Sequence, residues 1–137
     1  MDRIDKILNH DLFLYHLGKN NAAEADRRFC RHSMVHFLDV ARIGTIIALE
    51  EGLELDREWI YAAALLHDCG KHEQYENGTP HEQASARIAP EILKDCGFDD
   101  KETDVIVTAI SRHRDPEAAK EKNLNGCLLY TSDAADE

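Results

Sequence analysis

Residues 60–71 read IYAAALLHDCGK, an apolar run that ends in an adjacent histidine and aspartate, His67 and Asp68. We expect this run to form a buried helix, with Asp56 as its N-terminal cap. An imidazole and a carboxylate at consecutive positions offer one borderline and one hard ligand. This mixture suits a divalent transition metal that keeps open coordination positions. The stretch therefore predicts a metal site at the end of a core helix.

Helical signals also dominate upstream, and no segment shows the period-2 alternation of a convincing strand. The expected helices cover residues 4–15, closed by Gly18 and Asn20, residues 22–31, and residues 34–51, ended by Gly52. The third of these carries His36 on one stripe with Val40, Ile43 and Ile47. We therefore expect His36 to face the core.

Downstream, a polar loop is expected over residues 69–78. Thr79 and Glu82, with Pro80 between them, form a capping-box pattern that starts a helix to about residue 96. Pro90 should kink or divide that helix. Further helices are expected from Asp99, with Glu102 at the third position, and from residue 115. Together these elements predict an all-α fold, a compact bundle of about six or seven helices.

The bulk composition limits the classes of function. The chain has 137 residues, 43% hydrophobic and 31% charged, which predicts one globular domain. Its formal net charge of -11 disfavours nucleic-acid and membrane partners, and an anionic substrate would need local positive charge. The absence of an apolar leader and the spacing of the cysteines predict a cytoplasmic protein with reduced thiols; these are Cys30, Cys69, Cys96 and Cys127.

The last eleven residues, 127–137, have an unusual sequence. They resemble the translation of a transposase adapter used in some sequencing libraries. The expected organisation is therefore one domain over residues 1–126, truncated at its C-terminus, followed by a non-native tail. The alternative is an ordinary start of a C-terminal helix.

Four histidines and Asp68 stand where a helical bundle could gather them; the histidines are His36, His67, His81 and His113. Each alone has a plainer explanation, as a hydrogen-bonded core residue, a cap or a surface residue. Taken together they are harder to explain in that way, because burying a polar group costs several kcal/mol unless it is paired or metal-bound. One shared metal would account for all of them.

Four sequence blocks carry a family resemblance. They are H-x-x-x-V-A at residues 36–41, L-L-H-D-x-G-K at 65–71, P-H-E-Q-A-S-A at 80–86 and A-I-S-R-H-R at 109–114. In order and approximate spacing they resemble the HD superfamily of metal-dependent phosphohydrolases. The resemblance covers roughly residues 28–114, and it is specific for the superfamily but not for a substrate.

The resemblance implies a set of ligands. His36, His67 and Asp68 would be the core metal ligands, and His81 and His113 would complete a second site. The family's last ligand is an aspartate near the C-terminus. Asp133, three residues after Tyr130, stands at the corresponding place, inside the unusual tail. One or two divalent ions are implied, with Mn, Fe, Zn, Co, Ni or Mg as candidates.

The implied chemistry is hydrolysis of a phosphate ester or anhydride in a nucleotide or small phosphorylated metabolite. A divalent ion acidifies water and withdraws charge from phosphoryl oxygens. Asp68 would hold the attacking water, and Lys71 could contact a phosphate oxygen or be an ordinary solvated lysine. The alternative functions are a metal-binding sensor or regulatory module with little turnover, and a purely structural bundle. The sequence specifies no oligomeric state.

Overall fold

The computed structural model of this protein describes residues 1–23 and 34–128. Within these ranges the chain forms α-helices and a 3-10 helix, with a further helical turn at 124–128 and no strand. The expected all-α bundle is therefore confirmed. The elements are α1 (Asp2–Leu8), α2 (Asp11–Ala23), α3 (Met34–Glu50), α4 (Arg57–Leu66), α5 (Lys71–Asn77), α6 (His81–Asp95), α7 (Asp100–Ser111) and the 3-10 helix Pro116–Lys120.

The helix α4 lies at the centre of the fold and contacts α1, α3, α6 and α7. Its N-terminus is capped as expected, because the Asp56 carboxylate accepts a hydrogen bond from the Glu58 N–H at 2.8 Å. Leu65 and Leu66 at its end are fully buried. Each such side chain contributes about 1.5–3 kcal/mol when it leaves water. The end of α4, and the residues after it, are thereby held inside the bundle.

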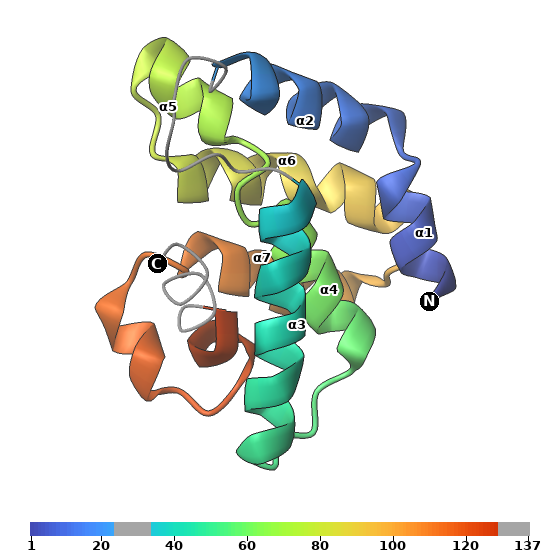
Figure 1. Ribbon diagram of the computed structural model, residues 1–137, viewed down its shortest axis with the longest axis vertical. Helices are drawn as coiled ribbons and strands as arrows, with labels where there is room; N and C mark the ends of the chain where they lie inside the picture. Colours follow the sequence, from blue (N-terminus) through green and yellow to red (C-terminus); the bar gives the residue numbers. More distant parts are fainter. Residues whose placement is uncertain (24–33, 129–137) are drawn as a thin grey trace.

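The remaining helices surround α4. Figure 1 shows α3 running vertically and α2 lying across the top, with α5 at the upper left. The helices α6 and α7 pack against each other, and α5 bridges α2 and α6. Asp99 caps α7 through the predicted capping box with Glu102. None of the helices that the structure describes has both the length and the apolarity needed to span a membrane.

The N-terminal part of the prediction is wrong in one respect. The expected single helix over residues 4–15 is two helices, and the chain turns at Asn9 and His10. The His10 Nδ1 accepts the Leu12 N–H at 3.1 Å, so a side chain starts the second helix. That helix continues past Gly18 to Ala23. Most of the helix expected over residues 22–31 lies outside the described residues.

The expected polar loop at residues 69–78 contains the helix α5. In this helix only His72 is buried, so the sequence lacks the apolar period that would have revealed it. The predicted Thr79 cap of α6 is also not formed. The Thr79 hydroxyl donates to Asn77 Oδ1 at 2.6 Å, and Pro80 takes the cap position. The helix α6 runs through Pro90 without being divided.

The buried face of α3 differs from the predicted stripe. Of that stripe only Val40 is buried, while His36, Ile43 and Ile47 are partly exposed. The core side is instead formed by Phe37, Val40, Ala41, Gly44 and Ala48. The helix is therefore rotated slightly from the expected orientation. His36 lies at the edge of the core face, and its side chain remains only 10% exposed.

Candidate metal centre

Four separate segments bring the candidate ligands to one place. His36 lies in the first turn of α3, and His67 and Asp68 follow the last residue of α4. His81 is the first residue of α6, and His113 comes two residues after α7 ends. All except His36 are buried. Of the predicted ligands, Asp133 lies outside the described residues, and the other five are gathered together.

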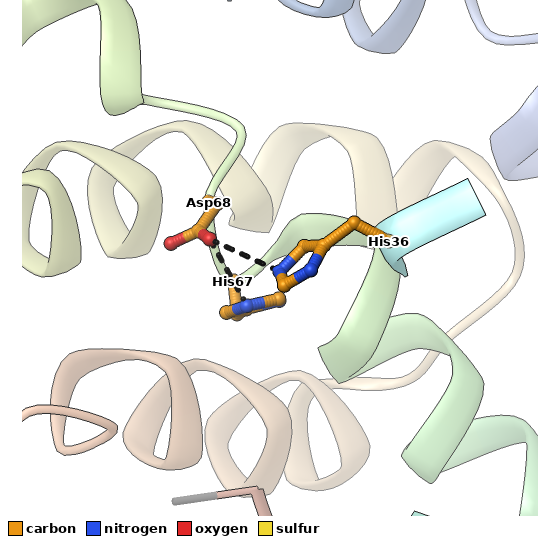
Figure 2. A group of neighbouring side chains, drawn as sticks. All are labelled: His36, His67 and Asp68. Atoms are coloured by element: carbon orange, nitrogen blue, oxygen red, sulfur yellow. Dashed lines mark ion pairs between the residues drawn. The ribbon is translucent and has the colours of Figure 1, made fainter. Parts of the chain in front are cut away.

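The first group consists of His36, His67 and Asp68, whose ligand atoms all lie within 4.8 Å of one another. The His67 Nε2 lies 3.1 Å from Asp68 Oδ2. The His36 Nε2 lies 3.9 Å from the same oxygen. Figure 2 shows both imidazoles directed toward this carboxylate from different helices. Two nitrogens and one oxygen thus face a common point.

The second group consists of Asp68, His81 and His113. Here the other carboxylate oxygen is used: Asp68 Oδ1 lies 3.4 Å from His81 Nε2 and 3.5 Å from His113 Nε2. The two imidazole Nε2 atoms are 3.1 Å apart. Asp68 therefore belongs to both groups and offers one oxygen to each.

Hydrogen bonds on the far side of the rings fix how two of the histidines face the centre. The His67 Nδ1 lies 2.6 Å from the carbonyl oxygen of Ala64, and the His113 Nδ1 lies 2.6 Å from that of Ile110. A carbonyl oxygen can only accept, so each Nδ1 carries the hydrogen and donates it. In the neutral ring Nε2 is then left with its electron pair, as a metal ligand requires.

His81 is oriented by a side chain instead. The Gln74 Oε1 accepts from the His81 backbone N–H at 3.2 Å and from its Nδ1 at 2.8 Å. Because a backbone N–H can only donate, the amide atom in this position is the oxygen, and Nδ1 is again the donor. Gln74, at the middle of α5, therefore both caps α6 and directs the His81 electron pair toward Asp68.

The electrostatics favour the protonation states that a metal ligand needs. Burial disfavours the charged form of Asp68, but the nearby His67 and His113 outweigh it and hold the pKa of that carboxyl well below its ordinary value. Burial lowers the pKa of His81 to about 3, although Asp68 opposes the shift. At neutral pH Asp68 is thus ionised and His81 is neutral.

The donor atoms fit a divalent ion. With both Nδ1 atoms donating, His81 and His113 bring their Nε2 atoms to 3.1 Å from each other and close to the same carboxylate oxygen. Either a proton on one of the rings or a metal ion bound by both would satisfy these nitrogen atoms. Two ligands about 2.1 Å from one ion lie about 3.0–3.4 Å apart at ordinary coordination angles. The observed separations of 3.1, 3.4 and 3.5 Å are close to this range.

Lys71 begins α5, three residues after Asp68, and is partly exposed. Its positive charge is near enough to His81 to lower the pKa of that ring, as does the charge of Arg114. The structure thus provides local positive charge beside the second group. The catalytic role of Lys71 stays a prediction.

Three polar residues near the centre were not singled out from the sequence; two of them, Asn20 and Ser85, are buried, and the third, Gln74, is exposed. They are Gln74, Asn20 and Ser85, and each contacts the turn at Asp68 or one of the histidines. No sequence signal marked Gln74, because its helix lacks an apolar period. Asn20 was interpreted only as the end of a helix. Their roles depend on contacts between segments distant in sequence.

The comparisons with known proteins agree with this geometry. Residues 34–137 match the HD domain family. The chain therefore belongs to the HD domain family, whose superfamily consists of metal-dependent phosphohydrolases. A protein of Clostridium beijerinckii described as "Uncharacterized protein" is 48% identical over 133 residues, covering 97% of this chain and 82% of the relative. No solved structure matches the chain.

Proposed function

We propose that this protein is a metal-dependent hydrolase of a phosphate ester or anhydride in a nucleotide or another small phosphorylated metabolite. The observation that carries the proposal is the position of Asp68. Its two carboxylate oxygens face two different histidine groups, one with His36 and His67 and one with His81 and His113. This arrangement suits two neighbouring ions that act on one phosphoryl group.

Each residue has a distinct part in the proposed reaction. The Nε2 atoms of the histidines would bind the cations, and Asp68 would supply the negative charge that the cations require. A divalent ion in such a site supplies acidified water and withdraws charge from the phosphoryl oxygens. Asp68 also offers an acceptor that can orient the attacking water. Lys71, close to the second group, would bind a phosphoryl oxygen of the substrate.

A small substrate agrees with the charge of the whole chain. The formal net charge is -11, so a long polyanion would be repelled. The cations Lys71 and Arg114, together with bound metal, would provide attraction only at the centre. A compact phosphorylated molecule can use this local attraction without approaching the rest of the acidic surface.

The test is a metal analysis of the purified protein followed by hydrolysis assays on nucleotides and phosphomonoesters, with and without EDTA. We expect bound divalent metal and EDTA-sensitive release of phosphate or of a nucleotide. Asp68→Asn should lower both metal content and hydrolysis. Asp100→Asn is the matched control, since the Asp100 side chain is 96% exposed on α7. Bound metal without hydrolysis of any tested substrate would contradict the proposed enzymatic function and favour a metal-binding sensor.

A further inference from the structure

Asn20 is a buried amide in the helix α2 that contacts the turn carrying Asp68. Its side chain is only 1% exposed, which is unusual for asparagine. The helix α2 ends at Ala23, whereas the match to the HD domain family begins at residue 34. Asn20 therefore belongs to a segment of this chain that the family match does not include.

The Asn20 amide makes three hydrogen bonds to the backbone around the metal centre. Its Nδ2 donates to the carbonyl oxygens of Asp68 at 3.0 Å and of Cys69 at 3.3 Å. Its Oδ1 accepts from the N–H of His72 at 2.8 Å. One side chain thus pairs the Cys69 carbonyl beyond the end of α4 and the His72 N–H in the first turn of α5, and gives the Asp68 carbonyl a second donor besides the Lys71 N–H.

The opposite side of the same turn is held by α6. The Gly70 N–H donates to Ser85 Oγ at 2.9 Å. The backbone is so close to α6 that a Cβ on Gly70 would lie 2.7 Å from the Ala84 Cβ. The residues after Asp68 are therefore confined between α2 and α6, and Asn20 is the α2 contact.

We propose that Asn20 is a positioning residue, which fixes the Asp68 backbone so that each carboxylate oxygen faces its own histidine group. This inference rests on the proposed metal-dependent function. Asn20 is well suited to the task because the site needs two donors and one acceptor at once. An aspartate of the same shape would set a carboxylate against two carbonyl oxygens. Ligands must be held within about 0.5 Å of their productive positions, so a small movement of this turn disturbs both groups.

The experiment compares Asn20→Ala and Asn20→Asp with two controls. Asn21→Ala removes an exposed asparagine one residue further along α2. Ile7→Val removes a methyl group from a fully buried side chain in α1, and so lowers stability without touching the metal centre. For each protein we would measure the far-UV circular dichroism, the melting temperature, the Kd for Co²⁺ and the visible absorption spectrum of bound Co²⁺.

We expect both Asn20 variants to keep the helical dichroism, to bind Co²⁺ at least about tenfold more weakly and to give an altered Co²⁺ spectrum. Both controls should keep the original Kd and spectrum, although Ile7→Val melts at a lower temperature. An unchanged Kd and spectrum in Asn20→Asp would overturn the inference while leaving the metal site intact. Loss of helical structure in both Asn20 variants would also overturn it, since Asn20 would then determine the fold itself. A failure of the unaltered protein to bind Co²⁺ or Mn²⁺ would instead refute the proposed function and this inference with it.

Discussion

His81 and His113 lie 32 residues apart in the chain, yet their Nε2 atoms are separated by 3.1 Å. His81 begins α6 and His113 follows the end of α7, and these two helices pack against each other. The two histidines therefore meet at the end of the α6–α7 hairpin that lies opposite the loop joining the two helices. Asp68 reaches the same point from the turn after α4. The second histidine group thus depends on the hairpin, and the first group depends on α3 and α4.

Because the histidines of the two groups come from different helices, we expect metal to be lost in steps when they are replaced. We expect His113→Ala to lower the bound Mn²⁺ by about one equivalent per chain, because His36, His67 and Asp68 remain in place. Asp68→Ala should remove both equivalents, since it supplies an oxygen to each group. The measurement is metal content after loading with Mn²⁺ and gel filtration. Equal metal content in His113→Ala and the unaltered protein would contradict the assignment of His113.

Gln74 gives a second prediction, because its Oε1 accepts from the His81 Nδ1 at 2.8 Å. Gln74→Leu removes the acceptor that fixes the ring. We expect it to weaken metal binding at the second group by about 10–100-fold, the usual effect of losing such a partner. Gln74→Glu retains an acceptor oxygen and should restore most of the affinity. Isothermal titration with Mn²⁺ measures both. Equal affinities for the Leu and Glu variants would show that Gln74 does not orient His81.

Much of the fold could be predicted because capping signals and apolar runs are local. Asp56 and Asp99 both start helices as expected, and the run before His67 forms the central helix. The helix α5 was missed because its one buried residue, His72, gives no period. The break at His10 was missed because it depends on a hydrogen bond that the backbone N–H of Leu12 donates to the His10 imidazole. Local patterns do not record such contacts.

For the candidate site, the sequence supplied the ligands but not what holds them. The motifs pointed to the five residues that the structure gathers, by resemblance rather than by geometry. The roles of Gln74 and Asn20 could not be predicted from the sequence, because the groups that they bind lie 7 and 48 residues away and belong to other elements. Only the packing of α2 and α5 around the turn brings these amides to the backbone and imidazole groups that they bind.

The acidic residue Glu102 lies in a network remote from the metal centre. The Arg3 guanidinium donates to both of its oxygens, at 2.8 and 2.9 Å, and the Trp59 indole N–H donates at 2.7 Å. These hydrogen bonds, led by those of Arg3, lower the pKa of Glu102 from 4.5 to about 2. The network joins α1, α4 and α7.

This shift predicts a specific loss of stability in acid. Because the pKa of Glu102 is lower in the folded state, its contribution is fully present above about pH 4.5 and is lost as the pH falls toward 2. Glu102→Gln keeps an amide that can serve the capping box of Asp99. We expect it to lower the free energy of unfolding by about 1–2 kcal/mol at pH 7 and by almost nothing near pH 2. Urea unfolding at several pH values measures this difference. A loss that stays constant with pH would contradict the role of the charge.

Two glycine substitutions test how tightly the turn after Asp68 is confined. A Cβ on Gly70 would lie 2.7 Å from both the Ala84 Cβ and the Ser85 backbone nitrogen, whereas one on Gly18 would meet nothing within 4 Å. Because the backbone of α6 cannot move aside cheaply, Gly70→Ala should destabilise the protein by about 1–3 kcal/mol and weaken Mn²⁺ binding. Gly18→Ala, within α2, should stabilise it by about 0.5–1 kcal/mol and leave Mn²⁺ binding unchanged. Unfolding in urea and titration with Mn²⁺ check both. If Gly70→Ala matched Gly18→Ala in both measurements, α6 would not confine the turn, and the position of Asp68 would have to be fixed by α2 alone.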